Sequence, residues 1–184
     1  MTSSTDTLPV PDLAAITDLH AELQCCIRTT PVLTKPDFDP IAGTDVCFKF
    51  ELLQASGTFK ARGAFSNLFA LDDAQREAGV TCVSAGNHAV AVAYAAMRLA
   101  IPAKVVMIKT ASPARVALCR QYGAEVVLAE DGPSAFETVR RIESEEGRFF
   151  VHPFNGYRTV LGTATLGYEW LQQAGELDAV IVPI

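Results

Sequence analysis

Short apolar runs alternate with amphipathic stretches along most of the chain, and from residue 80 onward the order is regular. This part of the pattern predicts strands over 80–83, 104–108, 125–128 and 149–151, with helices over 88–100, 113–122 and 133–146 between them. Pro113 suits the first turn of a helix and Gly123 suits a helix end. Strands that alternate with helices in this way predict a parallel α/β unit.

The segments on either side of this unit follow a less regular pattern. Before it we expect a helix over 13–27, strands over 32–33 and 46–50 around a turn region at 36–43, and a helix from about residue 58. After it we expect a turn at 152–154, a helix over 162–174 and a strand over 179–182. The sequence shows neither an internal repeat nor a low-complexity linker.

Composition favours small-molecule chemistry over binding to a polyanion. The 184 residues are 49% hydrophobic, which is enough to bury a sizeable core in one domain or two small ones. The net charge of −6 arises from 15 basic and 21 acidic residues without a basic run, which argues against nucleic acid and anionic membranes as partners. Residues 1–10 lack basic residues and an apolar core, so we expect neither a signal peptide nor a membrane anchor.

Cysteine and histidine positions predict no metal site. The cysteines lie at positions 25, 26, 47, 82 and 119, and the histidines at positions 20, 88 and 152. No pair of cysteines has metal-ligand spacing, and no histidine has a carboxylate or cysteine at ligand spacing. Five cysteines without a disulfide pattern favour a reducing cytoplasm.

Lys60 lies in the stretch Gly57-Thr58-Phe59-Lys60-Ala61-Arg62-Gly63-Ala64, among small and apolar neighbours. Such neighbours desolvate the ammonium group and depress its pKa, and a neutral amine can hold an aldehyde cofactor. The glycines let the backbone approach a bulky ligand, and Phe59 can lie flat on an aromatic ring. An amphipathic helix start with a solvated Lys60 accounts for the same residues, and this window alone favours that plainer interpretation.

A second motif, Ser84-Ala85-Gly86-Asn87-His88, follows the predicted strand at 80–83 and precedes a helix. Such a turn aims backbone N–H groups and the positive end of a helix dipole at the crevice beyond the strand, where a carboxylate or phosphate can bind. Capping of the helix by Ser84 and Asn87 is the alternative, and it is compatible with an anion site. We expect His88 to form a wall of the site rather than to react.

Together the two motifs resemble the threonine and serine dehydratases, which are pyridoxal-phosphate (PLP) enzymes of fold type II and are also related to serine racemase. The resemblance extends from Phe48-Lys49-Phe50-Glu51 through 123–126 and 152–154 to 178–183. It implies two three-layer α/β domains of the tryptophan synthase β type, with PLP in the cleft between them. It assigns residues 1–66 and 159–184 to the larger domain and residues 67–158 to a small inserted domain, and it suggests a homodimer.

The resemblance also implies roles for individual residues. Lys60 is the catalytic residue, holds PLP as a Schiff base and then removes the α-proton of the substrate. Phe59 packs on the cofactor ring, and Asn87 bonds the ring oxygen. The residues implied in substrate binding are Ser84, Ala85, Gly86, Asn87 and His88. The implied reaction is β-elimination and deamination of L-threonine or L-serine to a 2-oxo acid and ammonia.

Several departures from the family pattern change the details. Thr58 stands where serine is usual, and Gly162-Thr163-Ala164-Thr165 replaces Gly-Gln-Gly-Thr. Ala85 occupies the place of a second catalytic serine in serine racemases, which argues against racemase activity. Sulfur-amino-acid synthases usually have Lys-Asp-Arg where this chain has Lys60-Ala61-Arg62, and a threonine where it has His88. An oxidoreductase that binds a dinucleotide is less favoured, because no Gly-x-Gly-x-x-Gly follows a predicted strand.

The last residues, Pro183-Ile184, come where the family has a glycine-rich loop around the PLP phosphate. We therefore expect the chain to be a truncated form, a severed chain or a degenerate gene product. A non-catalytic scaffold that lacks the phosphate loop remains the alternative to an enzyme.

Overall fold

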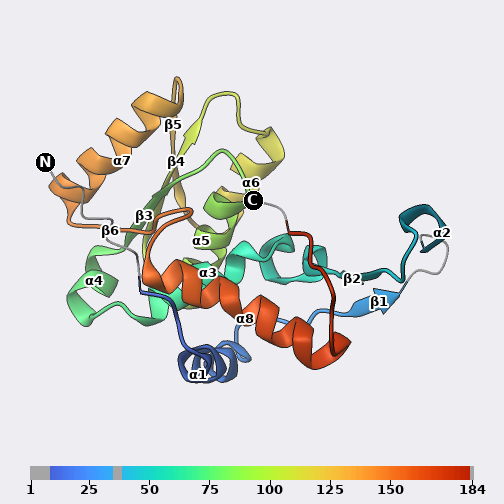
Figure 1. Ribbon diagram of the computed structural model, residues 1–184. Helices are drawn as coiled ribbons and strands as arrows, with labels where there is room; N and C mark the ends of the chain where they lie inside the picture. Colours follow the sequence, from blue (N-terminus) through green and yellow to red (C-terminus); the bar gives the residue numbers. More distant parts are fainter. Residues whose placement is uncertain (1–8, 35–38, 183–184) are drawn as a thin grey trace, which may run out of the picture.

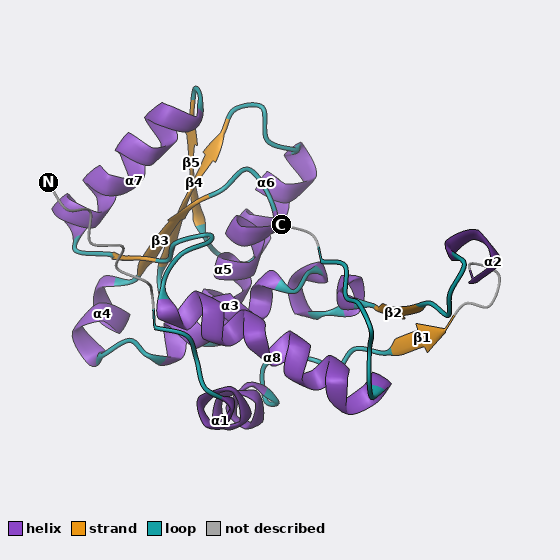
Figure 2. Ribbon diagram, in the orientation of Figure 1, coloured by secondary structure: helices purple, strands orange, loops and turns teal. Residues whose placement is uncertain are grey.

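A four-stranded parallel sheet lies at the centre of the computed structural model, which describes residues 9–34 and 39–182 (Figures 1 and 2). Its strands are β3 (Val80–Val83), β4 (Ala103–Ile108), β5 (Glu125–Ala129) and β6 (Phe149–Phe150). They lie in the order β5-β4-β3-β6, and all neighbours are parallel. The chain builds the sheet from β3 through β4 to β5 and then crosses back to place β6 on the other side of β3. The strand order therefore reverses between β3 and β6, and open α/β sheets bind ligands beyond the carboxyl ends of the strands at such a point.

Helices cover both faces of this sheet. They are α5 (Asn87–Arg98) and α6 (Pro113–Gln121) on one face and α7 (Gly132–Glu146) on the other (Figure 1). Alternate residues of β4 show this two-sided packing: Val105 and Met107 belong to the core that contains α5, whereas Val106 packs with Ala135 and Val139 of α7. Because both faces are buried, the central strands are almost continuously apolar in sequence.

A second helical layer holds the segment that contains Lys60. In it α3 (Lys60–Phe69) packs against α5 and α8 (Tyr157–Ala174), and α1 (Leu13–Leu23) lies against α8 (Figure 1). The helices α3 and α8 approach closely at Gly162, where an added Cβ would lie 2.5 Å from the carbonyl oxygen of Arg62. A residue with a side chain would force the two helices apart.

The remaining elements surround the start of α3. The short strands β1 (Val32–Thr34) and β2 (Cys47–Lys49) form an antiparallel pair away from the main sheet, near α2 (Asp39–Ala42) (Figure 2). Two 3₁₀ turns, η1 (Glu51–Leu53) and η2 (Ala55–Gly57), lead from β2 to α3. The helix α4 (Asp73–Ala78) joins α3 to β3 and is closed at its start by a capping box of Asp72 and Gln75.

Four predicted segments differ from the structure. The turn region predicted over 36–43 contains the helix α2, and residues 36–38 of that region lie outside the described part of the chain. The helix predicted over 13–27 ends at Leu23, because the chain then makes a turn in which the N–H of Cys26 donates to the carbonyl of Leu23. The helix predicted over 162–174 begins earlier, at Tyr157, since Gly162 lies inside it at the contact with α3 and not at its start. The strand predicted over 179–182 is wrong: these residues are irregular and exposed, because no described segment supplies the backbone partners that a strand needs.

A buried network of four charged side chains ties α3 to its surroundings. The Nε and Nη2 atoms of Arg62 donate to the two carboxylate oxygens of Glu51, at 2.9 and 2.8 Å. Nη2 also donates to Glu169 of α8 at 3.0 Å, and Nζ of Lys49 donates to the other oxygen of Glu169 at 2.5 Å. That same oxygen accepts the N–H of Thr30. The network therefore fixes the start of α3, two residues from Lys60, against α8 and the end of β2.

Candidate active site

Lys60 is the first residue of α3, and its amine is half-buried. Its Nζ donates to the carbonyl oxygen of Pro153 at 2.9 Å and lies 5.3 Å from the ring centre of Phe59 and 4.9 Å from that of Phe154. Burial lowers the pKa of Lys60, because desolvation disfavours the charged amine. No carboxylate among the described residues pairs with Lys60, so no ion pair opposes this lowering of its pKa.

Lys60 is placed at the start of its helix by a constrained turn. Ser56 has a φ of 62° and Gly57 has a φ of 75°, so the chain passes through the left-handed region just before α3. The hydroxyl of Thr58 then accepts the backbone N–H of Lys60 at 3.5 Å. The hydroxyl retained at position 58 thus faces the first turn of α3.

His88 lies in the first turn of α5 and is buried. Its Nε2 lies 2.9 Å from the carbonyl oxygen of Val151, and since a carbonyl only accepts, Nε2 carries the proton. Burial lowers the pKa of His88 to about 4, and the nearby positive charge of Lys60 also lowers it. His88 is therefore neutral at pH 7, and it is close enough to Lys60 for the two to interact.

The segment after β6 joins the two sequence motifs. Val151 accepts the bond from His88, and Pro153 accepts the bond from Lys60. The ring of His152 turns back on its own segment, where Nδ1 accepts the N–H groups of Phe154 and Asn155. From the sequence, residues 152–154 stand out only through the family resemblance. Their contribution comes mainly from backbone carbonyls, which have no side-chain signature.

The turn 84–87 follows the carboxyl end of β3, next to the end of β6. Ser84 accepts the N–H of Gly86 through its hydroxyl at 3.1 Å, and Gly86 precedes the first helical residue. Among the described residues no side chain caps α5, so the capping expected of Ser84 and Asn87 is not found there. The first N–H groups of α5 are thus left for another partner, which is the requirement for an anion site.

The candidate residues of this turn differ in exposure. Ala85 and Asn87 are exposed, whereas Ser84 and Gly86 are half-buried. Within residues 9–34 and 39–182, the Asn87 amide makes no hydrogen bond, and no hydrogen bond joins Lys60 directly to residues 84–87. Lys60 and the turn are brought near each other through His88 and the segment after β6.

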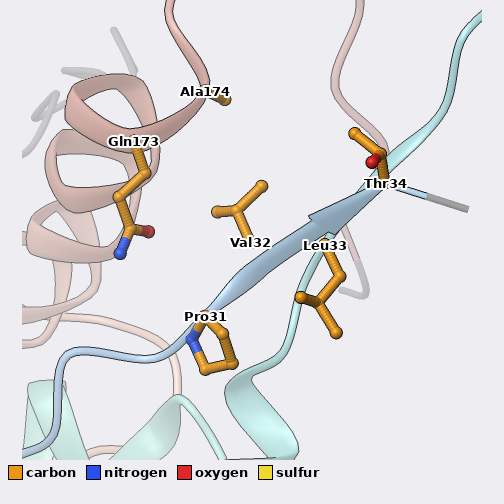
Figure 3. Close-up of a pocket in the computed structure, with 6 residues that line it drawn as sticks. All are labelled: Pro31, Val32, Leu33, Thr34, Gln173 and Ala174. Atoms are coloured by element: carbon orange, nitrogen blue, oxygen red, sulfur yellow. The ribbon is translucent and has the colours of Figure 1, made fainter.

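A separate open depression of about 520 Å³ lies at β1 and the end of α8 (Figure 3). It is lined by Pro31, Val32, Leu33, Thr34, Gln173 and Ala174. None of these residues belongs to either motif. The depression borders the buried ion network instead, because Gln173 accepts a hydrogen bond from Lys49.

A lysine whose pKa is lowered by burial thus lies near an uncapped helix start, at the point where a parallel sheet reverses its strand order. The family model for pyridoxal-phosphate dependent enzymes matches residues 24–184. This chain belongs to that family. Its fold is that of the fold-type II members, as the sequence predicted.

Individual relatives agree with this assignment. Phenylserine dehydratase of Ralstonia pickettii is 81% identical over 179 residues, which are 97% of this chain and 55% of that protein. Serine racemase of Oryza sativa subsp. indica is 38% identical over 174 residues, which are 94% of this chain and 51% of that protein. The solved structure of maize serine racemase matches with a TM-score of 0.88 at 34% identity, over 92% of this chain and 52% of that one. The chain thus spans about half the length of these relatives.

Two further observations concern membranes and metals. In the part of the chain that the structure describes, no helix is both long and apolar enough to cross a membrane. The same residues contain no group of three or more His, Cys, Asp or Glu side chains that could hold a metal ion. The homodimer, the cytoplasmic location and the domain boundaries at 66 and 158 stay predictions.

Proposed function

We propose that this protein is a PLP-dependent enzyme. It would eliminate the β-hydroxyl group of a hydroxy amino acid and release a 2-oxo acid and ammonia. The observation that carries the proposal is the environment of Lys60: a half-buried amine, held by the Pro153 carbonyl between two aromatic rings, with a lowered pKa. Because a relative at 81% identity is named phenylserine dehydratase, 3-phenylserine is the first substrate to test, ahead of the threonine and serine expected from sequence.

The residues present fit the cofactor. Lys60 supplies an amine whose pKa is lowered by burial, and the aldehyde of PLP reacts with the neutral form of an amine. Phe59 supplies a ring beside the amine, and Asn87 supplies an amide without a partner among the described residues. When bound, PLP withdraws electrons from the substrate Cα and so makes loss of the α-proton and of the β-hydroxyl easier.

The remaining tasks fall to the protein's own side chains and backbone. Lys60 is the base that takes the α-proton, and burial, which lowers its pKa, increases the fraction of neutral amine. The uncapped start of α5 and the turn at Ser84 and Gly86 bind the substrate carboxylate. His88 stays neutral and forms a wall. The water lost in elimination returns in hydrolysis, so the net products are a 2-oxo acid and ammonia.

Racemisation is the second candidate, since serine racemase is a relative at 38% identity. A racemase needs a second acid on the opposite face of the substrate, and by resemblance residue 85 would supply it. Ala85 has a methyl group that neither gives nor takes a proton. This supports elimination as the main reaction.

Product analysis tests the proposal. The purified 184-residue chain and the product of the complete reading frame are each incubated with PLP and with 3-phenylserine, L-threonine or L-serine. We expect release of the 2-oxo acid and ammonia in equal amounts, fastest with 3-phenylserine, and none from a Lys60→Met variant. Formation of a D-amino acid without 2-oxo acid would instead identify a racemase. No product from either form would support the non-catalytic scaffold.

A further inference from the structure

Arg115, in the first turns of α6, lies directly on the turn at residues 84–88. A Cβ added to Gly86 would be 2.3 Å from Nη1 of Arg115 and 3.4 Å from its Cζ. The φ of Gly86 is −151°, outside the left-handed region, so glycine is not required there for a positive φ. The guanidinium group of Arg115 instead occupies the position of a side chain at residue 86, so it lies against the backbone of the turn.

Arg115 has no carboxylate partner within residues 9–34 and 39–182. The described ion pairs use Lys49, Arg62, Lys104, Lys109 and Arg148. The first turn of α6 contains no acidic residue. An exposed guanidinium group that contacts a turn without neutralising a protein carboxylate is available to an anion from solution.

His88, the last residue of the turn, does not supply a full positive charge. His88 is neutral, and burial disfavours the charged form of Lys60. The uncapped start of α5 offers only the partial charge of its dipole. A substrate carboxylate that binds at this turn would therefore find a full counter-charge on Arg115.

We propose that Arg115 determines specificity for α-carboxylates by pairing with the carboxylate of the amino-acid substrate at the turn 84–88. The proposal rests on the proposed function of this turn. Arg115 would touch the substrate carboxylate and none of the atoms at which bonds break. Its loss should therefore raise KM and leave kcat nearly unchanged.

The test uses the PLP-loaded protein and a substrate analogue that cannot undergo elimination. L-phenylalanine has the amine and carboxylate of 3-phenylserine without the β-hydroxyl, and L-phenylalaninamide lacks the carboxylate charge. Each is titrated into the native protein and into Arg115→Gln, Arg115→Lys and Arg120→Gln variants, and the cofactor absorbance reports the Kd. Arg120 is an exposed arginine on the same helix and serves as the matched control.

We expect Arg115→Gln to raise the Kd of L-phenylalanine about tenfold, as for loss of a charge-assisted hydrogen bond, with the KM for 3-phenylserine rising in parallel. The Kd of the amide should not change, Arg115→Lys should be intermediate, and Arg120→Gln should match the native protein. The proposal is overturned if Arg115→Gln binds L-phenylalanine as the native protein does, if both ligands weaken equally, or if the native protein shows no preference for the carboxylate. Absence of the cofactor band from the native protein would instead refute the proposed function, and the role of Arg115 with it.

Discussion

Replacing Glu169 with glutamine removes one negative charge from the buried ion network. The side chains of Lys49, Arg62 and Glu169 are at most 4% exposed, and that of Glu51 is 11% exposed. Two positive charges would then share one carboxylate. Lys49 and Arg62 only donate hydrogen bonds. The NH₂ group of the glutamine could not accept from them, and its neutral oxygen would accept more weakly than the carboxylate. Removal of one partner from a buried ion pair typically costs about 3–5 kcal/mol, because the charge left behind stays desolvated.

We therefore expect Glu169→Gln to lower the free energy of unfolding by about 3–5 kcal/mol, measured by urea denaturation at pH 7. For a chain of this size, that loss corresponds to a fall in Tm of roughly 10 °C. Glu176→Gln is the control, because Glu176 is exposed just beyond α8 and should change stability by less than about 0.5 kcal/mol.

The pH dependence gives a second check on Glu169. Burial alone would raise the pKa of Glu169, but the hydrogen bonds and charges of Lys49 and Arg62 outweigh burial and lower it. A carboxylate with a lowered pKa contributes stability above its unfolded pKa, near 4.3, and this contribution is lost as the pH falls through the folded pKa. The native protein should lose this contribution in acid, whereas Glu169→Gln has none to lose. If Glu169→Gln is as stable as Glu176→Gln, the network does not hold α3 as argued.

Two further predictions concern packing and protonation. Gly162→Ala should lower stability by about 1–3 kcal/mol, because its Cβ would lie 2.5 Å from the backbone oxygen of Arg62, whereas Gly167→Ala on the same helix has open space and should be neutral or stabilising. Urea denaturation of the two variants measures this, and equal effects would refute the close helix contact. His88 has a pKa of about 4 in the folded state, below its unfolded value of 6.5, so its contribution to stability is complete above pH 6.5 and falls by roughly 1.4 kcal/mol per pH unit between 6.5 and 4. His88→Asn should lack this component when unfolding is compared at pH 7 and pH 5, and an unchanged pH dependence would contradict the buried neutral state.

The fold was predictable where strands are buried on both faces. Val80, Val105 and Val106 lie in short apolar runs separated by helical segments, and that pattern is typical of a parallel sheet covered by helices. The apolar run at 179–182 has the same composition, yet it forms no strand. A strand depends on a neighbouring backbone, and this information is not local in sequence.

The candidate site was predictable in its side chains and not in its backbone. Lys60 and His88 stand in recognisable motifs, but the carbonyl groups of Val151 and Pro153 that hold them do not depend on side-chain identity. The role of Arg62 was equally hidden, because its partner Glu169 lies 107 residues further along the chain. Both sets of contacts depend on tertiary structure rather than on local pattern.

The measurement that tests the central claim most directly is the location of a covalent PLP adduct. The protein is incubated with PLP, reduced with borohydride and digested, and the modified peptide is sequenced by mass spectrometry. Our account predicts one adduct, on Lys60, with loss of the cofactor absorbance in a Lys60→Met variant that remains folded. An adduct on another lysine, such as Lys104 or Lys109, with none on Lys60, would contradict the assignment of the active site.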